Sequence, residues 1–146
     1  MASDTPLPTT DELHRLYSAA LQAVLLDFQF IEEGLRRYIA GAYDLIRKRV
    51  DGEIAFKLSA KDLEKDSLGR LLVKFCQLSD NSALQATIAK LVPDRNICAH
   101  KGLLITHQLA EAPAGFEKLT ATLWRLRERT TTCVRDVIAE CEKVSM

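Results

Sequence analysis

One helical stripe constrains the fold of this chain more than any other feature. Its apolar residues follow one another at steps of three or four, with a mean spacing of about 3.6 residues, the α-helical period. Thr9 and Glu12 have the spacing of a capping box just before it. The stripe therefore predicts one long helix over about residues 10–50, straight or bent at Gly34 or Gly41. Its members are Leu13, Tyr17, Ala20, Val24, Phe28, Ile31, Leu35, Tyr38, Ala42 and Leu45.

The first half of this helix is apolar on most of its circumference. Between Ala19 and Ile31 the only polar residues are Gln22, Asp27 and Gln29. A helix covered on most sides needs either a thick core or a second chain. In a domain of this size we expect a homodimer, and the alternative is a central helix in a monomeric bundle. Arg47, Lys48 and Arg49 suit the end of the helix, where cations complement the dipole.

Further helical segments follow. Residues 52–65 are charged and predict a connection with a short helical turn. A second helix is expected over 67–78 and a third over 82–92, where Pro93 ends the pattern because it lacks an amide donor. Asp94 would cap a short fourth helix reaching about residue 102. The inward positions expected for the second and third helices are Leu68, Leu71, Leu72, Phe75, Cys76, Leu84, Ile88 and Leu91.

In the segment 103–115, Leu103, Leu104 and Ile105 fit either an extension of that helix or a short extended segment, and Pro113 and Gly115 mark a loop. A last helix is expected over 116–143. No segment shows the alternation of a half-buried strand. The expected fold is an all-α, single-domain helical bundle with a long first helix, spanning 10–146 after a disordered lead-in at 1–9.

Composition excludes several functional classes. Twenty basic and twenty acidic residues give a net charge of zero, so there is no overall basic field for nucleic acid. No apolar run is long enough for a bilayer and no signal peptide is visible, which predicts a cytoplasmic protein without membrane contact. The four cysteines are irregularly spaced and are expected to be reduced core thiols. Cys98 and His100 are two apart on a helix, which disfavours a metal site.

One constellation suggests chemistry, namely Arg95, Asn96 and His100. In the first turn of a helix capped by Asp94, free amides and the dipole would favour a phosphate. Asn96 and His100 share a face, and Arg95 can reach the same site. Cleaving RNA without a metal or cofactor needs a base for the 2′-hydroxyl and an acid for the leaving oxygen. A single imidazole does one of these at a time, whereas a twofold dimer supplies two.

The pattern Arg-Asn-x-x-x-His in a small helical bundle resembles the HEPN domains. Phe30–Arg36 on the long helix, Leu68–Leu72 and Ala99–Gly102 resemble them as well. The resemblance implies a homodimer with a composite, metal-independent endoribonuclease site in a toxin or antiviral-defence role. His100 would act as base or acid, Arg95 would bind the scissile phosphate and Asn96 would position it. It also implies an antitoxin or regulatory partner, although Gly102 replaces the tyrosine of the subgroup paired with nucleotidyltransferase antitoxins.

Other interpretations stay open. Arg95 can make an ordinary salt bridge, with Asn96 in a turn and His100 packed on a neighbouring helix. The chain would then be a non-catalytic dimeric helical module that binds RNA or a protein. A third hypothesis is a nucleotide-like ligand at the N-terminus of the motif helix. Lys101 would add positive potential at the motif, and Arg47, Lys48 and Arg49 would contact RNA if they lie beside it.

Overall fold

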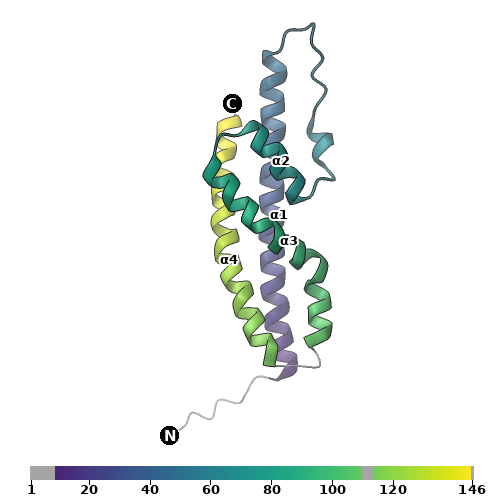
Figure 1. The fold of residues 1–146 in the computed structure, drawn as a ribbon, viewed down its shortest axis with the longest axis vertical. Coiled ribbons are helices and arrows are strands. Elements are labelled where there is room, and N and C mark those ends of the chain that lie inside the picture. Colours follow the sequence, from purple (N-terminus) through teal and green to yellow (C-terminus); the bar gives the residue numbers. More distant parts are fainter. Residues whose placement is uncertain (1–8, 110–113, 146) are drawn as a thin grey trace.

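The computed structural model describes residues 9–109 and 114–145, without the side chains of residues 10, 101–109 and 114. The lead-in predicted for 1–9 lies outside this range except for Thr9. The described chain forms helices and no strand, which confirms an all-α fold with a long first helix (Figure 1). Its elements are α1 (Thr10–Arg49), a 3-10 helix η1 (Ala60–Leu63), α2 (Leu68–Leu78), α3 (Ser82–Leu109), α4 (Ala114–Cys141) and a 3-10 helix η2 (Glu142–Val144).

The first helix is continuous over its predicted length. The Thr9 hydroxyl accepts the Glu12 amide at 3.2 Å, and the Glu12 carboxylate accepts the Thr9 amide at 3.3 Å, so the predicted capping box is present. At the other end, Arg47, Lys48 and Arg49 occupy the last turn. The helix continues through Gly34. A Cβ at this position would lie 2.5 Å from Val137 Cγ1, so the glycine allows α4 to approach closely.

Helices α1 and α4 lie side by side and run in the same direction, and α2 and the first part of α3 cross in front of them (Figure 1). Side-chain hydrogen bonds at two points fix the register of the pair. The Asp27 carboxylate accepts hydrogen bonds from the hydroxyls of Thr130 at 2.8 Å and Thr131 at 3.0 Å. Farther along, the Cys141 thiol donates to the Gly34 carbonyl at 3.2 Å.

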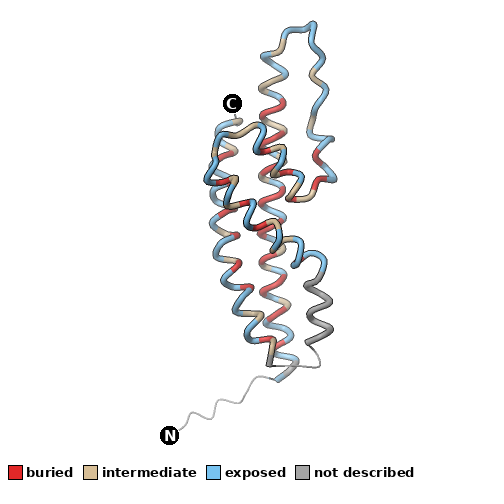
Figure 2. Tube along the Cα trace, in the orientation of Figure 1, coloured by how far each residue is buried: buried red, intermediate tan, exposed pale blue. Residues whose placement is uncertain are grey.

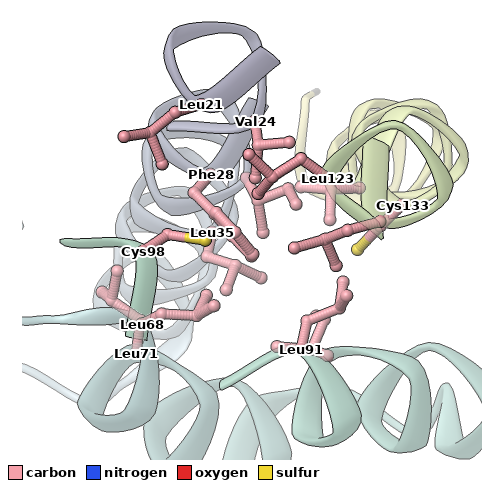
Figure 3. Close-up of a cluster of buried hydrophobic side chains, with 14 of the residues drawn as sticks. Leu21, Val24, Phe28, Leu35, Leu68, Leu71, Leu91, Cys98, Leu123 and Cys133 are labelled. Carbon is pink, nitrogen blue, oxygen red and sulfur yellow. The ribbon is translucent and has the colours of Figure 1, made fainter. Parts of the chain in front are cut away.

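The core lies between these helices, and the end of α1 beyond α2 is largely exposed (Figure 2). Cys98 and Cys133 are buried among its leucines, as predicted for core thiols (Figure 3). Cys76 is exposed, so its predicted inward position was wrong. It follows the fully buried Phe75 directly, and one helical residue turns the side chain by about 100°. Every helix of the described chain falls short of the apolar length that a bilayer crossing requires.

The predicted break at Pro93 was wrong. Helix α3 continues from Ser82 to Leu109 with Pro93 inside it, and its ribbon changes direction part-way (Figure 1). The inward positions Leu91 and Cys98 are seven residues apart, so the buried face keeps its helical phase across the proline. A proline kinks a helix in such a position when tertiary packing favours continuation. Helix α4 begins at Ala114, so Gly115 is helical, while Pro113 lies outside the described residues.

Candidate functional site

The motif lies in the interior of α3 and not in the first turn of a separate helix. Asp94 was expected to cap that helix. Its carboxylate instead pairs with Arg129 of α4, with 3.5 Å between Oδ2 and Nη1. The amides of Arg95 and Asn96 therefore belong to the hydrogen-bond ladder of a continuous helix. The expectation that free amides bind a phosphate at this point was therefore wrong. A phosphate here would have to be bound by side chains.

Arg95 is held by a carboxylate from α1. Its Nε donates to Glu32 Oε1 at 2.8 Å, and the two side chains are only 19% and 10% exposed. The other Glu32 oxygen lies 3.7 Å from Arg36 Nη2. Arg36 in turn donates to the carbonyls of Leu63 at 3.1 Å and Asp66 at 2.9 Å. Glu32 thus links the motif arginine to the segment that enters α2.

Glu32 is the site residue that the sequence analysis missed. A signal for it was present, because Glu32 follows Phe28 by four residues and precedes Leu35 by three. Both neighbours belong to the apolar stripe, so the carboxylate had to lie near the buried face of α1. A carboxylate in such a place requires a cation or several donors. This requirement would have indicated a basic partner for Glu32.

Asn96 and His100 are exposed and share one face of α3. The Arg95 Nη1 atom lies 3.4 Å from the Asn96 side-chain oxygen, a weak hydrogen bond that directs the guanidinium toward this face. A guanidinium has five N–H donors, and the bonds to Glu32 and Asn96 use two. The site therefore combines a cation with spare donors, an amide and a titratable imidazole on the surface.

Cys98 takes no part in this chemistry. Burial, with a smaller contribution from the Asp94 charge, raises the pKa of its thiol to about 11. The thiol therefore stays protonated at neutral pH and is neither a nucleophile nor a ready metal ligand. It borders a mostly apolar hollow of about 200 Å³ that also touches Tyr17 and Leu21 of α1. The described residues contain no cluster of His, Cys, Asp and Glu that could hold a metal ion.

The structure does not bring all predicted RNA-binding residues to the motif. The side chain of Lys101 lies outside the described part of the chain. Arg47, Lys48 and Arg49 lie fifteen or more residues beyond Glu32 on α1, about 22 Å or more along the helix axis. Arg47 is also paired with Asp44 at 2.6 Å. These three cations form a separate surface at the far end of α1.

No family model, no curated protein and no solved structure matches this chain.

Proposed function

We propose that this protein is a metal-independent endoribonuclease that acts as a homodimer. The supporting observation is that Arg95 is anchored on Glu32 beside the exposed Asn96 and His100. The resemblance of the motif to HEPN domains supports the same activity. It also suggests a toxin or antiviral-defence role in the cytoplasm, and an antitoxin or regulatory protein as a partner.

The reaction would be an intramolecular transesterification. A base removes the 2′-hydroxyl proton, the 2′-oxygen forms a bond to phosphorus, and the bond from phosphorus to the 5′-oxygen breaks. An acid gives a proton to that 5′-oxygen, which leaves a 2′,3′-cyclic phosphate and a 5′-hydroxyl. In a composite site, His100 of one copy would act as base and His100 of the other as acid. The spare donors of Arg95 would stabilise charge on the phosphoryl oxygens, and Asn96 would orient them.

RNA would reach this site over the exposed face of α3. Lys101, which follows His100 in the sequence, would be an RNA-binding residue that adds positive potential at the motif. Arg47, Lys48 and Arg49 would contact the RNA at a distance from the cleaved bond. Charge contacts of this kind add affinity without sequence specificity.

One observation favours a second candidate, a non-catalytic dimeric helical module that binds RNA or a protein partner. Arg95 is largely buried against Glu32, as expected for a structural ion pair. The third hypothesis, a nucleotide-like ligand at a helix N-terminus, loses its basis because the motif lies inside α3.

The decisive test is RNA cleavage by the purified protein in excess chelator. We expect wild-type cleavage to persist and to leave a 2′,3′-cyclic phosphate. The His100→Ala variant should lose activity by about a hundredfold or more, the range of acid–base catalysis.

His14→Ala is the matched control, because His14 lies outside the motif and packs edge-on against Phe116 of α4 at 5.9 Å between ring centroids. This variant should cleave at the wild-type rate. Equal cleavage by wild type and His100→Ala would contradict the assignment. Absence of cleavage by the wild type on all RNAs, together with intact RNA or protein binding, would favour the non-catalytic module.

A further inference from the structure

The outer face of α4 carries an exposed aromatic ring beside two arginines. We define the α4 strip as Trp124, Arg127, Thr131 and Arg135, which follow one another at steps of three and four and so share one side of the helix. Trp124 is 42% exposed, although the Arg127 guanidinium lies over its ring at 5.4 Å from the centroid. The strip lines an open hollow of about 540 Å³. Part of the indole surface is therefore open to a ligand.

The two arginines of the strip have hydrogen-bond donors to spare. Arg127 Nε has no hydrogen-bond partner among the described residues, and it lies 3.9 Å from the Asp27 carboxylate, which two threonine hydroxyls already occupy. Arg135 is exposed and makes no ion pair with any described residue. Glu128 is the acidic residue in the lining of the hollow, so the two arginines leave it basic. Guanidinium groups of this kind suit the oxygens of a phosphate.

We propose that the α4 strip binds single-stranded RNA outside the catalytic motif, an inference that rests on the proposed function. A base would stack on Trp124, and Arg127 and Arg135 would bind phosphates of the same strand. Stacking requires an unpaired base, because the bases of a duplex are already stacked on one another. The combination of an aromatic ring with cations therefore favours a single strand over a duplex. In a chain of zero net charge, such a strip supplies the local attraction that the chain as a whole lacks.

The surface of the strip continues toward the motif. Glu128 and Thr132 border this hollow and also a second one, of about 440 Å³, whose lining includes Lys90 of α3. Lys90, Ile97 and His100 are all exposed, and their spacing of seven and three residues places them on one side of α3. Lys90 precedes His100 by ten residues, about 15 Å along the helix. A strand stacked on Trp124 would thus run past Lys90 to His100.

The fluorescence of Trp124 tests the contact directly, because it is the one tryptophan of the chain. The probe is a 2′-O-methyl oligouridine of about twelve nucleotides, which lacks the free 2′-hydroxyl that cleavage requires. We expect the full-length protein to bind this strand with quenched emission, because a stacked base quenches an indole. Pairing the probe with a complementary oligoadenosine should weaken binding by about fivefold or more, since it removes the stacking.

Variants are compared by the anisotropy of a labelled probe and by helical circular dichroism. Trp124→Ala should weaken binding by about fivefold to a hundredfold, the range for one stacked base, and Trp124→Phe should retain most of the affinity. Arg127→Gln and Arg135→Gln should each lower the slope of log affinity against log salt by about 0.7, the value for one phosphate on a single strand. Arg15→Gln is the matched control, since it removes the same charge from an exposed position on α1 that lines neither hollow. Its affinity should equal that of the wild type.

Unchanged emission on binding, or equal affinity of wild type and Trp124→Ala, would overturn the proposed contact. Equal affinity for single strand and duplex would do the same, because charge alone would then explain binding. Failure to bind any oligouridine would also overturn it and would leave the strip to a protein partner. RNA cleavage by the wild type in any of these cases would keep the ribonuclease and remove the strip. Binding as expected without cleavage would keep the strip and remove the ribonuclease.

Discussion

At the scale of single residues, Glu140 shows how a buried carboxylate is made to stabilise the fold. It is 4% exposed near the end of α4. Asn81 donates to one of its oxygens at 2.8 Å, and Lys143 lies 3.0 Å from the other. Burial raises the pKa of Glu140, but the hydrogen bonds from Asn81 and Lys143 lower it by more, and the net pKa is below its ordinary value.

We therefore expect a pH-dependent contribution to stability. Because the pKa of Glu140 is lower in the folded protein, the stabilisation is complete above the unfolded pKa. It is lost as the pH falls through the folded pKa. At pH 6, Glu140→Gln should reduce the free energy of unfolding by about 1.5–3 kcal/mol, the range for hydrogen bonds to a charged group. The difference should shrink steadily below about pH 4.5, measured by urea unfolding.

Glu142→Gln serves as the control, because Glu142 is exposed and lies only two residues away. Its stability should follow the wild type at every pH. A deficit of Glu140→Gln that stays constant from pH 6 to pH 3 would show that shape, and not charge, accounts for the loss.

Residue types alone predicted part of the candidate site. Arg95, Asn96 and His100 stood out because their spacing combines a cation, an amide and an imidazole. Glu32 did not, because an isolated glutamate on a helix is most often solvated. The role of Glu32 comes from its contact with Arg95, which lies 63 positions away in the sequence. Such a pairing depends on how the helices pack.

At the scale of elements, the contact of α1 with α4 depends on Gly34. An added Cβ would lie 2.5 Å from Val137 Cγ1, and valine has little freedom to move aside. We expect Gly34→Ala to lower the free energy of unfolding by about 1–3 kcal/mol, the usual cost of overpacking. Thermal or urea unfolding would measure this loss.

Gly69→Ala provides the comparison within α2. Its Cβ would meet Val92 Cγ1 at 3.6 Å, an ordinary contact, so the higher helix propensity of alanine should raise stability by up to about 1 kcal/mol. The double variant Gly34→Ala, Val137→Ala should recover part of the loss. Stabilisation by Gly34→Ala alone would show that the two helices separate easily.

The sequence predicted most helix boundaries within a few residues, because apolar periodicity and caps are local signals. The prediction failed at Pro93, because the local rule that a proline ends a helix was outweighed by the packing of the residues around it. The proline removes one hydrogen bond, whereas Leu91 and Cys98 on either side of it both bury against the core. Periodicity carried across the proline would have predicted the continuous helix, and with it the mid-helix place of the motif.

At the scale of the whole molecule, a site built from two chains would be active only when both chains of the dimer carry His100. Under the proposed function, mixing wild type with a threefold excess of His100→Ala should lower wild-type cleavage roughly fourfold after subunit exchange, as random pairing requires. Cleavage rates before and after incubation of the mixture would measure this.

A threefold excess of His14→Ala is the control, since this variant keeps His100 and should not inhibit. Wild-type activity unaffected by any excess of His100→Ala would mean that one chain carries a complete site.

The parallel arrangement of α1 and α4 also has a consequence for synthesis. The hydrogen bond between Thr130 and Asp27 joins residues 103 positions apart, so the main packing partner of α1 is the last helix to leave the ribosome. At about 5–20 residues per second, the face of α1 that is buried in the finished protein stays open to solvent for several seconds. Early pairing between nascent chains, or shielding by a chaperone, would therefore compete with folding during that interval.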